Sequence, residues 1–390
     1  MPAPTPAIAQ VIAQAISDSG SAPESRSGPY DSQGHLAEQL RLAADALKSP
    51  PGATEAFGGL VAALDALARQ EQTLAAFGDL LVTNVKDAAE QTKLIQTQSQ
   101  ALDKLVQIQT SSWMKLDDLL QIALLNAWSD ELAKPRHADP RRLTRHGFKV
   151  YSQCDEDGII QEIFRRIGTT NRVFVEFGVE TGSECNSVKL LVEGWRGLWL
   201  EGAPQYCQEI VARFRPFMEQ RRLAVTQAFI TAENINDLIG RNDLIGQNCL
   251  LESGGLRGEI DLLSIDIDYN DYWVWKAIDV ISPRVVVIEY NATLRPPLSL
   301  VVPYDPTATW QSNNYHGASL EALVRLGDSK GYRLVGCNYA GSNAFFVRKD
   351  LTKDLFFDPA TAEAHYEPLR TFFANLKAGH PAQPGAYLMV

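Results

Sequence analysis

Two acidic residues that end apolar runs are the first candidates for binding a ligand. The run 173–176 ends in Glu176, and the loop after it contains Gly178 and Gly182; a later run ends in Glu201. A strand, a glycine-containing turn, a helix, a second strand and then an acid are the layout of a nucleotide-binding βαβ unit. The loop reads Glu-x-Gly-x-x-x-Gly, not G-x-G-x-x-G, so it favours a ligand without a pyrophosphate. S-adenosylmethionine (SAM) is therefore the first candidate cofactor.

The same unit offers further contacts to such a cofactor. A helix that begins after Gly182 directs free N–H groups toward the loop, where the carboxylate of SAM fits. Ser183 and Asn186 are side-chain donors there or, alternatively, caps of the helix. Glu201 can accept both ribose hydroxyl protons. Phe229, after a third apolar run, stacks on the adenine ring or, as is commoner for a lone phenylalanine, belongs to the core.

A second group of polar residues ends two later apolar runs. Asp266 and Asp268 follow one run, and Glu289 and Asn291 follow the next. Adjacent parallel strands lie about 4.8 Å apart, so we expect these side chains to converge at one edge of a sheet. Carboxylates that close repel one another unless a cation or a proton compensates. The sequence therefore predicts a site at this edge.

Two uses of this group compete with a simpler one. Asp268, Glu289 and Asn291 can hold a divalent cation such as Mg²⁺, which prefers oxygen ligands. Alternatively, Asp268 or Glu289 is a general base in a metal-free site. His316 is a further candidate for deprotonating a hydroxyl or binding a metal. The simpler interpretation makes the acids caps and turn residues, and His316 an ordinary loop histidine.

The elements that must position these residues alternate along the C-terminal part of the chain. Runs such as 285–288 are continuously apolar, which is typical of strands buried on both faces. Seven strands, with a short loop around Gly341 between the last two, predict a Rossmann-like, doubly wound α/β sheet ending in an antiparallel hairpin. The expected strands are 173–176, 198–201, 223–229, 262–266, 285–289, 332–337 and 344–348; the expected helices are 158–166, 187–193, 204–214, 273–278 and 319–330.

The composition divides the chain into five parts. We expect a disordered tail (1–34), an α-helical, coiled-coil region (35–128), a basic linker (129–150), the α/β domain (151–353) and a C-terminal helical tail (354–390). In the second part apolar residues recur at three- and four-residue steps, which favours a coiled coil and a homo-oligomer; a helix packed on its own chain is the alternative. These residues include Leu102, Leu105, Ile108, Trp113, Leu116 and Leu120.

The bulk composition excludes some classes of protein. A net charge of −11 argues against nucleic acid as a partner. The five cysteines are scattered without a C-x-x-C pair, which indicates reduced thiols and no zinc knuckle. Neither a signal peptide nor a run of about 18 apolar residues is present, so we expect a cytoplasmic protein. The basic linker is a solvated connector or, alternatively, a peripheral contact to anionic lipid at the inner face of the membrane or to a glycan carrier.

Several strings between residues 151 and 350 resemble the FkbM-type SAM-dependent methyltransferases. They include YSQCDEDGI, VEFGVETG, EGWRGLWLEG, SIDIDYNDYW and VIEYN. The resemblance implies a Rossmann-like class I domain and an O-methyl transfer, often to sugars in glycans or natural products. Residues 1–150 lie outside it.

The resemblance also implies roles for single residues. Glu176, Gly178 and Gly182 would hold SAM, Glu201 its ribose, and Asp266 would lie next to the methionine end. One departure is visible, because the family tends to have glycine where this chain has Tyr269. A tyrosine resists the positive φ that glycine accepts, so the turn after Asp268 is expected to differ.

The leading hypothesis is a SAM-dependent O-methyltransferase that acts on a hydroxyl of a sugar or glycan. Asp268 or His316 would take the hydroxyl proton, with or without a divalent cation that lowers the hydroxyl pKa. The alternatives are a non-catalytic coiled-coil scaffold with a degenerate Rossmann-like module, and another metal-dependent enzyme on the same fold. A titration with SAM separates the scaffold from the enzyme.

Overall fold

The computed structural model describes residues 69, 72–73, 88–240, 255–370 and 380–390. The chain forms two compact units, Met1–Trp128 and Ser129–Val390. In the first unit the long helix α4 (Ala88–Leu132) is described, and it continues into the second unit. The predictions for residues 1–87 lie outside the described residues, apart from three isolated helical positions.

The predicted apolar seam of α4 is only partly covered. Leu105, Trp113 and Leu116 are half-buried, whereas Leu102 and Leu120 are 55% and 45% exposed. Helix α4 is too polar to cross a bilayer, and within the described residues no other helix is both long and apolar enough to do so.

The second unit is built on one seven-stranded sheet. Its strand order is β3-β2-β1-β4-β5-β8-β7, and all neighbours are parallel except β8, which runs antiparallel to both β5 and β7. The strands are β1 (Val173–Phe177), β2 (Arg196–Glu201), β3 (Leu223–Gln227), β4 (Gly258–Ile265), β5 (Ile281–Glu289), β7 (Tyr332–Cys337) and β8 (Asn343–Arg348). Successive strands are added to one side of β1 up to β3 and then to its other side from β4 onward, as in doubly wound nucleotide-binding sheets. The predicted fold class is therefore confirmed.

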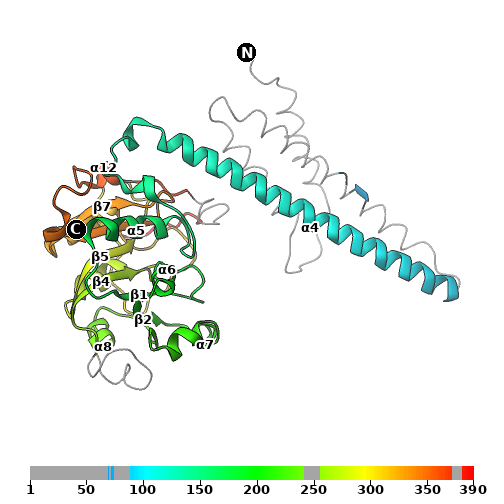
Figure 1. The fold of residues 1–390 in the computed structure, drawn as a ribbon, viewed down its shortest axis with the longest axis horizontal. Coiled ribbons are helices and arrows are strands. Elements are labelled where there is room, and N and C mark those ends of the chain that lie inside the picture. The colour runs from blue at the N-terminus through cyan, green and yellow to red at the C-terminus, as the bar shows by residue number, and fades with distance from the viewer. Residues whose placement is uncertain (1–68, 70–71, 74–87, 241–254, 371–379) are drawn as a thin grey trace, which may run out of the picture. The chain divides into compact units, whose positions relative to one another are not determined.

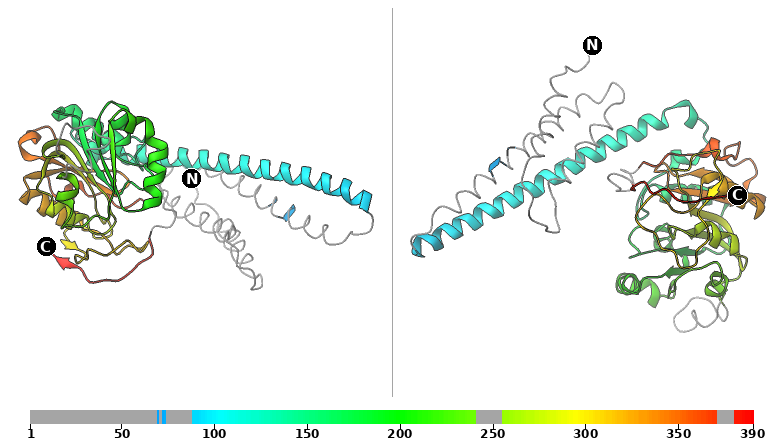
Figure 2. Two further views of the ribbon diagram at one scale, coloured as in Figure 1. Left: turned by 90° about the horizontal axis from the view of Figure 1, so that it is seen from below. Right: turned by 180° about the vertical axis from the view of Figure 1, so that it is seen from behind.

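Helices follow most strands and cover both faces of the sheet (Figures 1 and 2). They are α5 (Glu156–Ile167), α6 (Val188–Val192), α7 (Pro204–Glu219), α8 (Ile235–Gly240), α9 (Asp271–Ala277), α10 (Leu320–Ser329), α11 (Lys349–Thr352) and α12 (Ala362–His365). Two short 3₁₀ helices, η1 (Pro135–His137) and η2 (Leu143–His146), precede α5. The expected helices agree with α5, α6, α7, α9 and α10 to within a few residues, except that α7 continues to Glu219.

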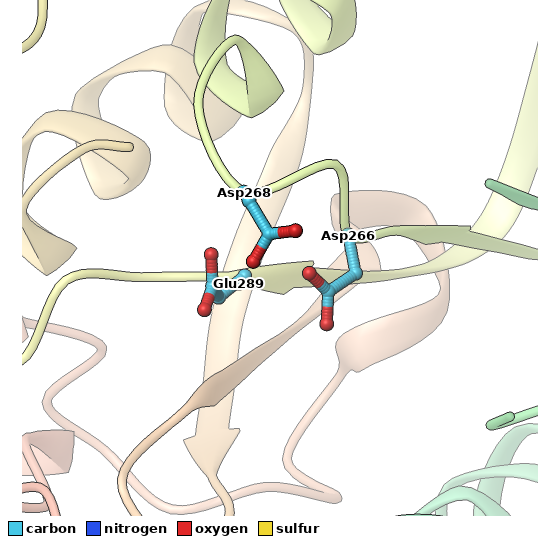
Figure 3. Close-up of side chains that lie close together, drawn as sticks. All are labelled: Asp266, Asp268 and Glu289. Atoms are coloured by element: carbon cyan, nitrogen blue, oxygen red, sulfur yellow. The ribbon is translucent and has the colours of Figure 1, made fainter. Parts of the chain in front are cut away.

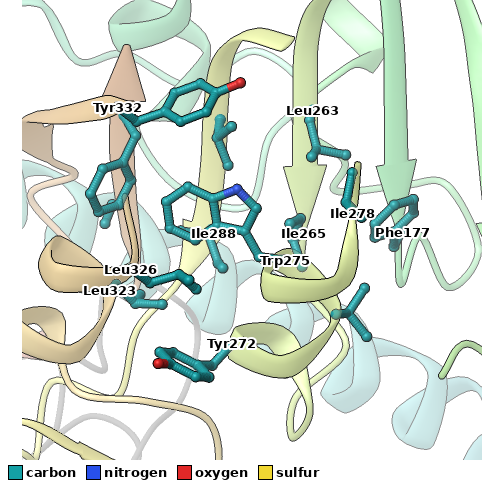
Figure 4. Close-up of a cluster of buried hydrophobic side chains, with 14 of the residues drawn as sticks. Phe177, Leu263, Ile265, Tyr272, Trp275, Ile278, Ile288, Leu323, Leu326 and Tyr332 are labelled. Atoms are coloured by element: carbon teal, nitrogen blue, oxygen red, sulfur yellow. The ribbon is translucent and has the colours of Figure 1, made fainter. Parts of the chain in front are cut away.

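Alternate side chains of each strand enter two separate hydrophobic cores. Val175 of β1 packs in the core that contains α8, α9 and α10, and its neighbour Phe174 packs in the core that contains α5, α6 and α7. Trp275 of α9 lies at the centre of the first core, among side chains of the central strands and α10 (Figure 4). Apolar side chains cover both faces of the sheet. The carboxyl edge of the sheet is therefore the place where polar side chains gather.

The C-terminal stretch differs from the expected helical tail. Within residues 354–370 and 380–390 the only helix is the four-residue α12. Residues 380–390 are extended and end in β9 (Leu388–Met389), which pairs with β6 (Leu300–Val301). Pro381 and Pro384 lack a backbone N–H and disfavour helix, which explains the difference.

The basic stretch 134–149 packs against the rest of the second unit. The guanidinium of Arg136 pairs with the buried Glu367, and Arg142 donates to the Ala364 carbonyl at 2.9 Å. Arg145 donates to the carbonyl of the buried His137 at 2.8 Å. These cations satisfy main-chain and carboxylate acceptors of their own chain, which is a structural role.

Candidate functional site

A cavity of about 880 Å³ opens at the carboxyl edge of the sheet. Its wall is formed by the residues that follow β1, β2, β3, β4 and β5, by the β7–β8 turn, and by residues of the loops around Trp310 and His316. Binding cavities for small molecules range from about 300 to 1,000 Å³, so this space can take a nucleoside cofactor and part of a second molecule. It also lies where doubly wound sheets bind ligands.

Gly178 and Gly182 are required by close packing around the loop after β1. Their φ angles are +68° and +76°, in the region that favours glycine. A Cβ on Gly178 would lie 1.5 Å from the carbonyl oxygen of Asp266, and one on Gly182 would lie 2.6 Å from the ring of Phe214. The first glycine therefore lets the β1 loop approach the end of β4, where the acids lie.

Glu176 is buried and faces the chain rather than open space. Its carboxylate accepts hydrogen bonds from the backbone N–H groups of Asn186 and Ser187 at 2.8 and 3.0 Å, and from the Ser187 hydroxyl. Burial raises the pKa of this carboxyl. Asn186 in turn donates to the Ser264 hydroxyl at 3.1 Å. Glu176 and Asn186 both line the cavity, but their polar groups mainly fix the loop between β1 and α6.

Ser183 lies on the exposed side of the same loop. Its hydroxyl is 2.7 Å from the Thr181 hydroxyl and also accepts from Arg213. The side chain lines the cavity. Of the two predicted donors, Ser183 is thus the more accessible one.

Glu201 ends β2 at the cavity wall and is nearly buried. One carboxylate oxygen accepts from the Ala203 N–H and the other from the Glu180 N–H, both at 2.8 Å. Each oxygen keeps one lone pair for a ligand hydroxyl. Phe229 also lines the cavity and is 48% exposed, which excludes the core alternative for its ring.

Glu180 is an acid at this end of the cavity that the sequence analysis missed. It has a φ of +45° and lines the cavity. Burial raises its pKa, and the charge of Glu201 raises it further. Its position inside the glycine-containing loop was the available signal.

Three carboxylates meet at the ends of β4 and β5. Asp266, Asp268 and Glu289 each offer an oxygen atom within 4.8 Å of the others, and the three side chains turn toward one another (Figure 3). Burial raises the pKa of Asp266 well above its ordinary value, and the charges of Glu289 and Asp268 raise it further. Burial and the charge of Asp268 likewise raise the pKa of Glu289. Such a cluster demands protons or a cation, and oxygen ligands suit a hard divalent ion.

The turn after β4 takes its unusual conformation at Asp268, not at Tyr269. Asp268 has a φ of +64°, and aspartate tolerates this region better than most residues. Tyr269 avoids the strain, and its ring contacts the ring of Tyr315 at a centroid distance of 6.3 Å. Tyrosine in place of the family's glycine is therefore compatible with a carboxylate aimed at the cluster.

Asn291 does not join the carboxylates as a metal ligand. Its Nδ2 donates to the carbonyls of Asn314 and His316 at 2.9 and 3.0 Å. Its Oδ1 accepts from both the backbone N–H and the hydroxyl of Thr293, at 3.0 and 2.5 Å. With both lone pairs used, no ligand atom is left, and Asp266 takes the third place in the cluster. Asn291 instead fixes the loop that carries His316.

His316 approaches the cluster from that loop. Its Nδ1 lies 3.5 Å from Oε2 of Glu289 and has no hydrogen-bond partner, although the residue is only 8% exposed. Burial lowers the pKa of His316, while the charges of Asp271 and Asp268 oppose that shift. A neutral imidazole beside a carboxylate can accept a proton from a hydroxyl group.

Two aromatic rings stand next to His316. Trp310 and His380 line the cavity, with ring centroids 4.7 Å apart. His380 is 6.2 Å from His316 by the same measure. His380 is not among the residues predicted from the sequence, because it lies in a stretch expected to be a helical tail. Nothing in the local sequence places it beside His316.

The site residues therefore fall into two sets along the sheet. Gly178, Glu201 and Phe229 lie on the side of β1, β2 and β3, and the carboxylates lie on the side of β4 and β5. One continuous cavity joins the two sets. That arrangement can bind a nucleoside at one end and present a second molecule to acids and a histidine at the other.

Comparisons with known proteins give only distant similarity. No family model and no curated protein matches the chain. Solved structures that resemble it include the StiE O-MT, residues 942–1257 (14% identity, 46% of this chain and 51% of that chain, TM-score 0.27). Others are the glycopeptide N-methyltransferase MtfA complexed with sinefungin (12%, 50% and 85%, 0.31) and the O-methyltransferase from Bacillus cereus with SAH (14%, 58% and 88%, 0.32).

The sequence identities and the TM-scores of these similarities are low. The chain spans about half the length of the StiE structure. The fold of this protein follows from its strand order, and the site follows from its residues.

Proposed function

We propose that this protein is a SAM-dependent methyltransferase that transfers the methyl group to a hydroxyl of a sugar or glycan. One observation carries the proposal: a single cavity joins a glycine loop and a strand-end acid to a carboxylate cluster with a histidine. The strand order places this cavity where doubly wound sheets bind nucleosides. The FkbM-type resemblance in residues 151–350 supports the same function.

The cofactor half would lie over β1 and β2. Glu201 keeps a free lone pair on each oxygen for the two ribose hydroxyls. Phe229 offers an exposed ring for stacking on adenine. Gly178 and Ser183 line the part of the cavity where the amino-acid end of SAM would lie, next to Asp266. No pyrophosphate is needed to fill this half.

The chemical step is a transfer in line from sulfur to oxygen. SAM supplies a methyl group on a positively charged sulfur; the new O–C bond forms as the C–S bond breaks, and its electron pair stays on the sulfur of S-adenosylhomocysteine (SAH). The chain must hold the acceptor oxygen in line and remove its proton. His316 is neutral near pH 7 because burial lowers its pKa, so its ring can take that proton. Asp268 is the second candidate for this role.

The carboxylate cluster would hold a divalent cation in the acceptor half. Asp266, Asp268 and Glu289 supply three oxygen ligands, and the unpartnered, buried Nδ1 of His316 faces Glu289. Burial raises the pKa of each of the three carboxyl groups, and the charges of neighbouring acids add to this shift, although at Asp268 the charge of His316 opposes it. A cation relieves this repulsion without protonating them. A bound cation would also lower the pKa of the acceptor hydroxyl.

The proposed acceptor is a sugar because the acceptor half combines carboxylates with aromatic rings. Trp310 presents its ring next to His316, and its Nε1 is already bonded to the Asn313 carbonyl at 2.8 Å. The apolar face of a pyranose can pack on such a ring while its hydroxyls reach the acids.

Calorimetry with SAH, followed by methyl transfer from labelled SAM, tests the proposal. We expect SAH to bind. We also expect labelled methyl groups to be transferred to a glycan extract or to a methyl pyranoside, in a linkage that is stable to base because it is an ether. Absence of SAH binding would favour a scaffold with a degenerate module. SAH binding with label recovered only on nitrogen would refute the hydroxyl acceptor. Cation-dependent turnover without label would indicate another metal-dependent enzyme.

We also propose that α4 mediates assembly into a homo-oligomer. Leu102, Val106 and Ile108 are 55%, 53% and 45% exposed, and a second copy of the same helix is the simplest partner for such side chains. Light scattering tests this. The double variant Leu102→Glu/Val106→Glu should lower the mass of the assembly in solution toward that of the monomer. Lys104→Glu, at an exposed polar position, should leave the mass of the assembly unchanged. A wild-type protein of monomer mass would refute the proposal.

A further inference from the structure

The C-terminal segment, defined as residues 380–390, returns to the cavity beside the acceptor half. His380 lines the cavity together with Trp310 and His316. Its ring meets the ring of Trp310 edge-on, at 4.7 Å between centroids and an interplanar angle of 85°. The cavity wall next to His316 is thus made partly by a segment that lies far from it in the sequence.

Three hydrogen bonds, one of them between main-chain groups, join this segment to the loop before His316. The Asn314 N–H donates to the Pro381 carbonyl at 3.0 Å, and the Gln383 N–H donates to Oδ1 of Asn314 at 2.7 Å. The Tyr315 hydroxyl donates to the Ala386 carbonyl at 2.5 Å. Asn314 and Tyr315 directly precede His316, so the segment helps to fix the position of the histidine.

A second set of contacts fastens the end of the segment. Strand β9 pairs with β6, and the Val390 N–H donates to the Ser299 carbonyl at 3.1 Å. Arg325 of α10 donates to the Val390 carbonyl at 2.8 Å. The side chain of Met389 points away and is 85% exposed. Most residues of the segment are exposed, so hydrogen bonds contribute more to its attachment than apolar burial does.

Gly385 packs tightly against the ring of Tyr315. A Cβ at this position would lie 2.1 Å from Cε2 of Tyr315, and two further ring atoms would lie within 2.5 Å. The ring of Tyr315 also meets the ring of Tyr387 at 5.0 Å between centroids. Any side chain at position 385 must therefore displace the segment or the tyrosine.

We propose that the C-terminal segment completes the acceptor site, with His380 and Trp310 as the aromatic pair that binds the sugar ring. His380 would select acceptors by shape, and the segment would position His316 through Asn314 and Tyr315. Burial lowers the pKa of His380, so its ring is neutral near pH 7 and suits an uncharged acceptor. This inference rests on the proposed function, because it assigns the acceptor half of the same cavity.

Binding measurements on the SAH complex test the aromatic pair. The probes are the methyl pyranosides of glucose, mannose and rhamnose, titrated into protein saturated with SAH. We expect at least one pyranoside to bind the wild-type protein. His380→Ala and Trp310→Ala should each weaken pyranoside affinity by about tenfold or more. Both variants should bind SAH with an affinity within about twofold of wild type. Met389→Ala is the matched control in the same segment and should change neither affinity.

Hydrogen exchange tests the link between the segment and His316. Gly385→Val should raise the exchange rate of the Asn314 amide by at least about tenfold, because its acceptor is Pro381. The same variant should weaken pyranoside binding and leave SAH binding unchanged. Tyr315→Phe removes one hydrogen bond while keeping the ring, so a smaller effect in the same direction is expected.

The outcomes separate this inference from the proposed function. If wild type binds no SAH, the methyltransferase proposal fails. If it binds SAH but no pyranoside, the sugar acceptor and the aromatic pair both fail while methyl transfer stands. The role of the segment is refuted if pyranosides bind with equal affinity to wild type and to His380→Ala. It is also refuted if Gly385→Val raises the exchange rate of the Asn314 amide without lowering pyranoside affinity.

Discussion

Replacing Gly178 by alanine should damage both the fold and the cofactor half. The residue has a φ of +68°, which costs an L-residue about 1–2 kcal/mol. The added Cβ would also lie 1.5 Å from the Asp266 carbonyl oxygen, so the backbone of one loop must move. Overpacking of this kind costs about 1–3 kcal/mol. We therefore expect a loss of roughly 2–5 kcal/mol in the free energy of unfolding.

A matched glycine isolates the close approach from the backbone strain. Gly331 has a φ of +84°, and a Cβ added to it would have no atom within 4 Å. Gly331→Ala should therefore cost only the strained φ, about 1–2 kcal/mol, and its SAH affinity should equal that of wild type. Gly178→Ala should lose SAH affinity by at least about tenfold, which corresponds to about 1.4 kcal/mol. Urea denaturation and calorimetry supply both numbers.

The comparison of the two glycines can refute the reasoning. Equal losses of stability in Gly178→Ala and Gly331→Ala would mean that the approach to Asp266 is not tight. Wild-type SAH affinity in Gly178→Ala would mean that the loop after β1 does not shape the cofactor half. Either result would remove the physical basis for placing a nucleoside there.

Three further predictions concern single groups. Glu201→Gln should weaken SAH binding by at least about tenfold (about 1.4 kcal/mol) in calorimetry, whereas Glu209→Gln, at an exposed position of α7, should not; equal affinities would exclude a ribose contact. Mn²⁺ should raise the melting temperature of wild type but not of Asp268→Asn, and a shift of the same size in both would place the cation elsewhere. Burial, aided by the charge of Glu156, raises the pKa of Asp155 to about 7. A raised carboxyl pKa means that the folded state binds the proton more tightly, so this group should favour folding as the pH falls from about 7 to about 5, by roughly 1.4 kcal/mol for every tenfold rise in proton concentration. Asp155→Asn should flatten that part of the urea-denaturation pH profile, and an unchanged slope would contradict the assignment.

The sheet could be predicted from the sequence because its strands are buried on both faces. Residues 285–288 are continuously apolar, and β5 contains them. The glycines after β1 and the acid at the end of β2 are local patterns, and the structure places them at one cavity. The predicted cluster at the ends of β4 and β5 was right in outline, since Asp268 and Glu289 meet there.

The parts that could not be predicted depend on contacts between distant segments. The side-chain amide of Asn291 has an oxygen that could bind a metal. That amide is instead hydrogen-bonded to Thr293 and to the carbonyls of Asn314 and His316. The convergence of Asp266 with the other acids was predicted, but the close approach of Gly178 to the Asp266 carbonyl was not, because that contact joins two separate strand ends. His380 lies at the cavity through contacts of the C-terminal segment with Asn314 and with β6, residues that lie far from it in the sequence.

The attachment of Arg136 determines how this chain can be shortened. Glu367 is 1% exposed, and its carboxylate is neutralised by Arg136 from one side and by Arg370 from the other. A truncated protein that starts at Tyr151 would keep every strand yet remove one of these two cations. A partly uncompensated carboxylate would then remain in the interior, close to the cavity lining at Leu369. Expression of the α/β unit alone should therefore begin before Arg136, for example at the unit boundary at Ser129.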